Sequence, residues 1–238
     1  MEEDLAIHSF KLIWIIIVSV FFSSHAFGVT LQSAHLATIE KNLNQQVKCP
    51  HGDQITKIGI RIHVSLDAKR ALEEESQWLT LQLNTANQLF QSIKVCFQVQ
   101  KVMALSPKHL IMKTRKQRTS LGRTQGALLR GSIDLFIVSQ LNDVDRIGEV
   151  IRGVHWRDPK DRKFKRWIIL SRIARAQVLA HELGHYFSLP HSKYAKSIMN
   201  KTPRKKPPYD QRGFVKAEIK QMKRAKSKML QQKYLIAL

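Results

Sequence analysis

The chain has 238 residues, of which 43% are hydrophobic, and carries a formal net charge of +22. This length is enough for one domain with a real hydrophobic core. The positive charge is clustered: residues 101–130 hold eight Lys or Arg and no acid, and residues 201–238 hold twelve against two acids. No recognisable nucleic-acid-binding module accompanies this charge, which argues against a specific nucleic-acid partner.

The first 26 residues have the layout of an export signal. Lys11 precedes the apolar run 12–22, and Ser24-His25-Ala26 places small residues where a signal peptidase cuts. The run is too short for a comfortable membrane span, and the acidic start Glu2-Glu3-Asp4 is atypical of a signal. We therefore predict a signal peptide over residues 1–26 and a secreted, periplasmic or cell-envelope protein. An uncleaved membrane anchor is the alternative.

The following part of the chain predicts an N-terminal segment, a strand, a helix and a second strand. Residues 27–54 form the segment, and a pro-segment is one interpretation of it. Alternating apolar residues predict a strand over 58–64, and Asp67 is a candidate cap for the helix after it. Residues 95–102 read as the second strand. The apolar positions of the helix are Leu72, Leu79, Leu83, Ala86 and Phe90.

A long basic stretch, residues 107–131, comes before the next predicted strands. The short apolar run 133–138 is typical of a buried central strand. Residues 153–157 and 167–170 predict two more strands. A helix is then expected to begin near Arg172, with Ser171 as its N-cap. The strand-helix-strand opening favours a mixed sheet with largely parallel pairing.

The most informative motif lies in this last helix and reads HELGHYFSLPH. His181 and His185 are four residues apart, so a helix places both imidazoles on one face. Neutral imidazole is a good zinc ligand, and catalytic zinc sites commonly use three protein ligands. His191 is the candidate third ligand if the helix ends soon after His185. Glu182 is the candidate general base for a zinc-activated water.

This segment resembles the zinc-binding signature of the metzincin metalloproteases, in which the motif is followed by a methionine turn. His181, His185 and His191 match the three ligands, Glu182 matches the general base, and Met199 matches the methionine beneath the metal. Ser188 stands where the family usually has Gly, and a non-Gly residue with positive φ costs about 1 kcal/mol or more there. Lys201 replaces the tyrosine of the astacin-like and serralysin-like branches, so the resemblance is closer to matrixin-like or small bacterial members.

The resemblance implies an α/β (α+β) fold, with a mixed, mostly parallel sheet, an active-site helix and a small helical C-terminal subdomain. The metalloprotease domain would span residues 55–238, with an upper subdomain to about residue 187 and a lower subdomain over 188–238. The strand 153–157 would be an exposed antiparallel edge to which an extended peptide adds. Trp156 on it could equally be an ordinary half-buried aromatic.

The C-terminal part predicts a connector and a final helix. Residues 203–208 hold three prolines and three basic residues and read as an extended connector. After Gly213 the apolar spacing predicts an amphipathic helix with a basic outer face. We expect this helix to dock on the lower subdomain, with attachment to a membrane surface as the alternative.

Two cysteines, Cys49 and Cys96, leave two interpretations open. An even count in an exported protein suggests one disulfide. Alternatively, Cys49 lies in a pro-segment and caps the zinc with its thiolate, an arrangement that resembles latent matrixins.

Together these features predict a monomeric zinc metalloendopeptidase with Zn²⁺ as cofactor and a protein or peptide as substrate. The rival is an exported basic protein that binds the cell envelope or a polyanion and keeps a non-catalytic metal site. The basic clusters would attract an anionic polymer or an anionic membrane surface, although they could also merely keep the protein soluble.

Overall fold

The structure is a computed structural model that describes residues 32–50, 52, 54–65, 71–125, 131–161, 165–200 and 207–238. The predicted export signal, the cap at Asp67 and residues 203–206 of the predicted connector lie outside these ranges. Within them, none of the helices has the length and apolar character needed to cross a membrane.

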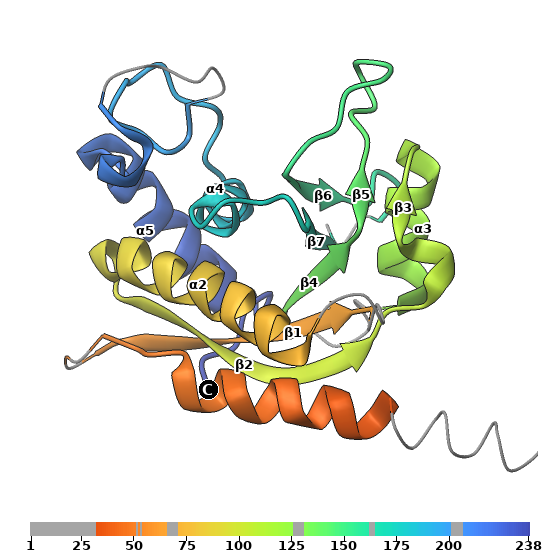
Figure 1. The fold of residues 1–238 in the computed structure, drawn as a ribbon. Helices are drawn as coiled ribbons and strands as arrows, with labels where there is room; N and C mark the ends of the chain where they lie inside the picture. The colour runs from red at the N-terminus through yellow and green to blue at the C-terminus, as the bar shows by residue number, and fades with distance from the viewer. Residues whose placement is uncertain are drawn as a thin grey trace, which may run out of the picture.

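A five-stranded sheet forms the centre of the molecule (Figure 1). Its strands follow the order β2-β1-β4-β7-β6, and all neighbours are parallel except β6, which pairs antiparallel with β7 at the edge. The predicted mixed, mostly parallel sheet and the antiparallel edge strand are therefore confirmed. The strands are β1 (Thr56–Val64), β2 (Val95–Ala104), β4 (Ile133–Val138), β6 (Gly153–Arg157) and β7 (Arg166–Ser171).

Helices cover both faces of this sheet. The larger apolar core lies between one face and the helices α2 (Leu72–Phe90) and α4 (Val178–Tyr186). Helix α3 (Arg115–Gln125) closes a smaller core on the opposite face, together with the short strands β3 (Ile111–Met112) and β5 (Gln140–Leu141). Helix α5 (Lys216–Gln231) comes last and packs its apolar side on the larger core.

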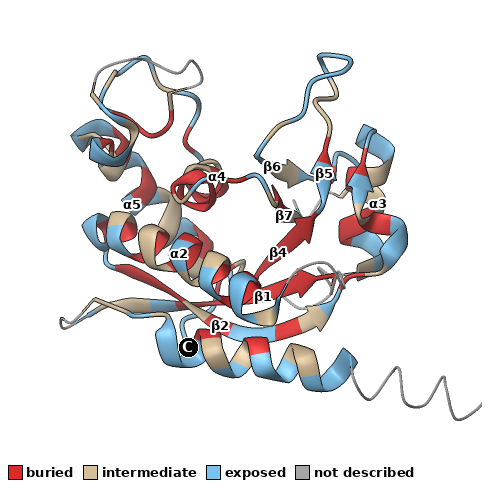
Figure 2. Cartoon of the chain, viewed as in Figure 1, coloured by how far each residue is buried: buried red, intermediate tan, exposed pale blue. Residues whose placement is uncertain are grey.

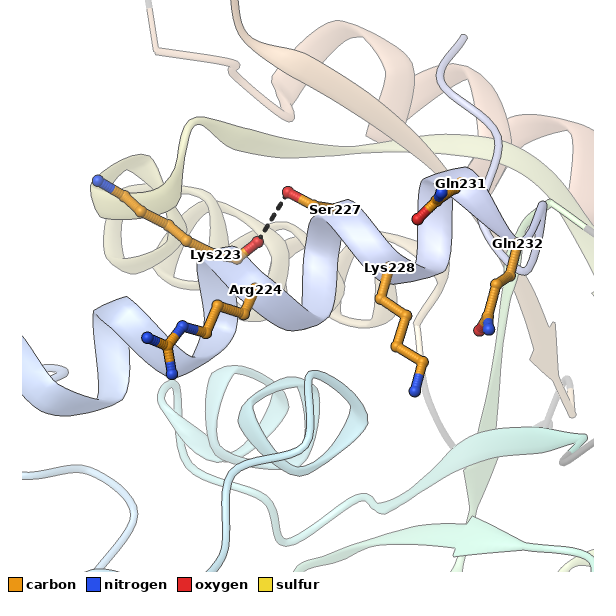
Figure 3. Close-up of a pocket in the computed structure, with 6 residues that line it drawn as sticks. All are labelled: Lys223, Arg224, Ser227, Lys228, Gln231 and Gln232. Atoms are coloured by element: carbon orange, nitrogen blue, oxygen red, sulfur yellow. Dashed lines mark hydrogen bonds between the residues drawn. The ribbon is translucent and has the colours of Figure 1, made fainter.

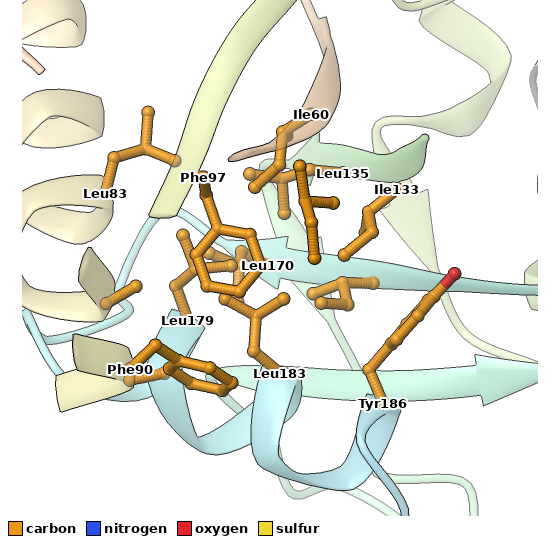
Figure 4. Packing of buried hydrophobic residues seen from close by; sticks show 14 of the residues in the cluster. Ile60, Leu83, Phe90, Phe97, Ile133, Leu135, Leu170, Leu179, Leu183 and Tyr186 are labelled. Atoms are coloured by element: carbon orange, nitrogen blue, oxygen red, sulfur yellow. The ribbon is translucent and has the colours of Figure 1, made fainter. Parts of the chain in front are cut away.

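Alternation along the strands produces the two cores. Leu135 on β4 and Leu170 on β7 point to the larger core, where they meet Leu179 and Leu183 of α4 (Figure 4). Phe136 and Trp167 point to the smaller core. The central strand β4 is buried along its whole length, as its apolar run predicts (Figure 2).

Polar residues on β1 are buried as well. Arg61 and His63 lie on the face opposite the larger core, where Arg61 pairs with Asp134 at 2.7 Å and His63 Nε2 lies 3.0 Å from an Asp134 oxygen. His63 also stacks on Phe136 with ring centroids 4.2 Å apart. A buried charge is tolerated when it is paired in this way.

The N-terminal segment packs on the domain. Residues 32–46 form a helix whose Ile39 and Leu43 are fully buried. Glu40 in this helix accepts a hydrogen bond from the Val102 backbone at 2.8 Å, which satisfies an N–H on the edge strand β2. Cys49 and Cys96 form a disulfide with Cα atoms 5.5 Å apart. The disulfide interpretation is confirmed, and the Cys49 sulfur is not placed to cap a metal. Whether this segment is removed stays a prediction.

One helix was not predicted, and the predicted start of another is wrong. The basic stretch 107–131 contains helix α3, which has too few apolar residues to be recognised from the sequence. The motif helix begins at Val178, not near Arg172, and Ser171 ends β7 instead of capping a helix. The later start has a cause in the tertiary structure. Gln82 Nε2 of α2 donates hydrogen bonds to the carbonyls of Ala174 and Arg175, which would otherwise accept the backbone N–H groups of a longer helix.

Candidate active site

Helix α4 places two of the predicted ligands side by side. His181 and His185 lie four residues apart with ring centroids separated by 4.8 Å. His181 Nδ1 lies 2.6 Å from the carbonyl of Ile198, and His185 Nδ1 lies 2.7 Å from that of Leu189. A carbonyl only accepts, so each Nδ1 carries the proton and each Nε2 keeps its lone pair. A hydrogen bond from Nδ1 to a carbonyl fixes the orientation of a histidine ring whose Nε2 binds a metal.

The chain turns back directly after α4. Ser188 adopts φ of +69°, so the left-handed turn that the family makes with Gly is present here with Ser. The Leu189 N–H bonds to the Gly184 carbonyl at 2.9 Å and closes the helix end. His191 then comes to 4.7 Å from His185 and 5.6 Å from His181, measured between ring centroids.

The three histidines fit a zinc ion. Their candidate ligand nitrogens all lie within 4.8 Å of one another. Two nitrogens on a tetrahedral zinc with Zn–N bonds of about 2.0–2.1 Å are about 3.4 Å apart, so the triad must close by about 1 Å when the ion binds. His191 is exposed and lies on a loop, and is therefore the ligand that can move. The predicted triad is brought together as expected.

Met199 packs against α4, the helix that carries two of the three histidines. It is fully buried, and its sulfur packs so closely on Gly184 of α4 that a side chain at that position would collide with it. The turn around it is held by Ser197, whose hydroxyl donates to the Glu218 carboxylate at 2.8 Å and accepts from the Met199 N–H at 2.9 Å. Glu218 belongs to α5, so the last helix supports the metal site.

Glu182 lies on α4 between the two ligands and is buried. Its carboxylate accepts a hydrogen bond from the His155 backbone N–H of β6 at 2.7 Å. Burial raises its pKa to about 7, against smaller opposing effects of His185, the His155 N–H and Arg118. A carboxyl with a pKa near neutrality can exchange a proton at neutral pH, as a general base must.

Burial acts in the opposite direction on the ligands. It lowers the pKa of His181 and of His185, which favours the neutral imidazole that binds metal. The site therefore combines neutral histidines with a carboxyl of raised pKa. This pattern is common where proteins perform acid–base chemistry.

Sequence reasoning missed two residues beside the site. His155 of β6 packs edge-on to Tyr186, and burial lowers its pKa to about 3, with Arg166 adding to the effect. Tyr209 lies in a short 3₁₀ turn, Tyr209–Gln211, and burial raises its pKa, which Glu182 also raises and nearby arginines lower. Neither carries a motif, because only the folded chain brings β6 and this turn next to α4.

Trp156 is half-buried, as the plainer interpretation predicted. Its indole nitrogen donates to the Thr119 hydroxyl at 3.1 Å, and the Arg118 guanidinium lies 5.1 Å from the ring. These contacts fasten the edge strand β6 to α3 and keep it in place beside Glu182.

Comparison with known proteins gives a fold but no closer relative. No family model and no curated protein matches the chain. The structure is similar to metalloproteinase-II from Bacteroides fragilis, with 12% identity and a TM-score of 0.51 over 79% of this chain and 60% of that one. The fold is metzincin-like.

Two further similarities to solved structures are weaker. An archaemetzincin from Methanopyrus kandleri aligns at 16% identity and a TM-score of 0.47, over 75% of this chain and 98% of that one. A zinc-dependent peptidase from Methanocorpusculum labreanum aligns at 14% identity and 0.39, over 69% and 99%. At these identities the similarity concerns the fold.

Proposed function

We propose that the protein is a zinc-dependent endopeptidase with His181, His185 and His191 as ligands and Glu182 as general base. The observation that carries this proposal is the buried carboxyl of Glu182, held beside a converging histidine triad. A structural zinc site needs no such group, and its burial costs stability. The rival, a polyanion-binding protein with a non-catalytic metal, leaves this arrangement unexplained.

The edge strand β6 supplies a place for an extended peptide. The His155 N–H bonds to Glu182 instead of β7, so His155 directs its backbone groups away from the sheet. Backbone groups alternate along an antiparallel strand, and Gly153 and Arg157 therefore point the same way as His155. A peptide that adds to this edge lies next to Glu182.

The reaction divides between the ion and the chain. When bound, zinc polarises the scissile carbonyl and lowers the pKa of water. Glu182 takes the proton of the attacking water and passes it to the leaving amine. The His155 N–H orients the carboxylate, while Met199 and Gly184 fix the floor beneath the ligands.

Export is part of this proposal. The 1–26 segment resembles a signal peptide, and a disulfide such as Cys49–Cys96 persists in an oxidising compartment. Intact-mass measurement should find a mature N-terminus near Phe27. Met1 retained on a protein recovered from the cytoplasm would contradict export.

The experiment is metal analysis of the purified protein combined with cleavage of a broad peptide mixture. We expect about one zinc per chain, and we expect Glu182→Gln to keep the zinc while hydrolysis falls by about 10²–10⁴-fold. Glu149→Gln, at an exposed carboxylate, is the matched control and should keep full activity. Cleavage that survives Glu182→Gln would reject the protease proposal in favour of the binding protein.

A further inference from the structure

The outer face of α5 is a continuous basic stripe. Its exposed basic side chains recur at helical spacing, so they line one side of the helix over about 18 Å. They are Lys216, Lys220, Lys223, Arg224 and Lys228. The only acid of the helix, Glu218, is buried and bonds to Ser197 and to the Val215 N–H. The stripe therefore presents positive charge alone.

This charge is not neutralised by the described part of the protein. None of the five side chains forms an ion pair with a described carboxylate. The positive field also extends beyond the stripe: Lys226 bonds to the Ile93 carbonyl at 2.8 Å, and its pKa is lowered by burial and by the charges of Lys223 and Lys94. Like charges gathered in this way repel one another, and an anionic ligand would relieve the repulsion.

A shallow groove of about 590 Å³, wide open to solvent and lined only by α5 and the residue after it, lies on the same stripe (Figure 3). Cationic side chains alternate there with a hydroxyl and two amides, and no residue of the histidine triad contributes to it. The lining residues are Lys223, Arg224, Ser227, Lys228, Gln231 and Gln232. The groove can therefore bind anionic groups and, between them, groups that both donate and accept hydrogen bonds.

Two kinds of anionic partner fit this surface poorly. Met222 and Met229 of α5 are buried in the core, so the helix has no apolar side left to insert into a bilayer. The groove holds no aromatic side chain on which the bases of a single-stranded nucleic acid could stack.

We propose that the outer face of α5 binds an acidic polysaccharide, with its sulfate or carboxylate groups on Lys223, Arg224 and Lys228 and its hydroxyls on Ser227 and Gln231. A polysaccharide chain carries anionic groups and hydroxyls in alternation, which is the chemistry that the groove offers. This surface is distinct from the histidine triad: no triad residue lines the groove, and Glu218, on the opposite side of α5, bonds to Ser197 in the turn before Met199. Binding would hold the enzyme on the polymer without occupying the triad.

The test compares two triple variants that lose equal charge. Lys223→Gln, Arg224→Gln and Lys228→Gln together should weaken binding to immobilised heparin by about 10²-fold at 0.1 M salt and lower the slope of log K against log salt by about 2–3. The control combines Lys108→Gln, Lys113→Gln and Lys116→Gln, at exposed lysines of the other basic cluster. It should leave both quantities nearly unchanged. Equal losses in the two variants would overturn the proposal, because a general field would then explain the binding.

Further measurements distinguish an acidic polysaccharide from other anionic partners. Ser227→Ala should weaken heparin binding by about 2–10-fold without changing the salt slope, since it removes a hydrogen bond and no charge. Polygalacturonate in place of heparin distinguishes a carboxylated from a sulfated polymer. Tighter binding of duplex DNA or of phosphatidylglycerol vesicles than of both polysaccharides would overturn the assignment. Circular dichroism confirms that each variant is folded.

Discussion

The buried carboxyl of Glu182, which the proposed reaction needs, should lower the stability of the folded protein at neutral pH. This carboxyl has a pKa raised from 4.5 to about 7 by burial. Between these pH values the folded protein holds a proton that the unfolded chain releases. The free energy of unfolding of the metal-free protein therefore falls as pH rises from about 4.5 to about 7. Glu182→Gln cannot ionise and should lack this loss.

The magnitude follows from the size of the shift. Each pKa unit is worth about 1.4 kcal/mol, so ionised Glu182 lowers the free energy of unfolding by about 3 kcal/mol at pH 8. Metal-free Glu182→Gln should then exceed the parent protein by about 3 kcal/mol at pH 8 and match it near pH 4. For a domain of this size the difference corresponds to about 6–12 °C in Tm. Gln keeps an oxygen that can accept the His155 N–H.

Thermal unfolding of chelator-treated proteins between pH 4 and pH 8 measures this difference. Other carboxyls titrate in both proteins and cancel, and Glu149→Gln should follow the parent curve. Excess zinc should shrink the gap, since a cation on the triad favours the carboxylate. Parallel curves for the parent and Glu182→Gln would refute the reasoning, because the carboxyl would then not be buried as the structure has it.

Three further changes probe the site and its supports. His191→Ala should weaken zinc binding, measured against a competing chelator, about as much as His185→Ala does; unchanged binding would place the third ligand elsewhere. Ser188→Gly should raise the free energy of unfolding by up to about 1 kcal/mol, because Gly accepts the φ of +69°, whereas a clear loss would show that the serine is needed. Reduction of the Cys49–Cys96 bridge, which spans 47 residues, should lower the free energy of unfolding by about 2–4 kcal/mol. Thermal unfolding with and without reductant measures this loss, and an unchanged Tm would count against the bridge.

The parts that could be predicted from sequence are those with local signals. The alternation and the helical spacing of apolar residues located the main strands and α2, because each of these elements buries one continuous apolar face. The ligands His181 and His185 follow from a spacing that any helix would satisfy. His191 was a candidate only on the condition that the helix ends soon after His185, and the turn at Ser188 meets that condition.

The misses have tertiary causes. The start of α4 depends on Gln82, a buried amide of α2 that binds the carbonyls before Val178. Helix α3 has few apolar residues, and a single Gly122 lets it approach Trp167 in the smaller core. His155 contacts Glu182 through its backbone, which no side-chain pattern reveals.

Three energetically costly features of this chain lie beside the triad. Glu182 keeps a buried carboxyl, the His155 Nε2 is buried with no described partner, and Ser188 has a left-handed backbone. Each costs about 1–3 kcal/mol, and such costs persist only where the surrounding structure enforces them. Here the enforcement comes from the floor beneath the ligands, where Met199 presses on Gly184 and Glu218 of α5 secures the turn through Ser197. Loss of Glu218 should therefore disturb zinc binding although it touches no ligand, and this links the last helix to the metal site.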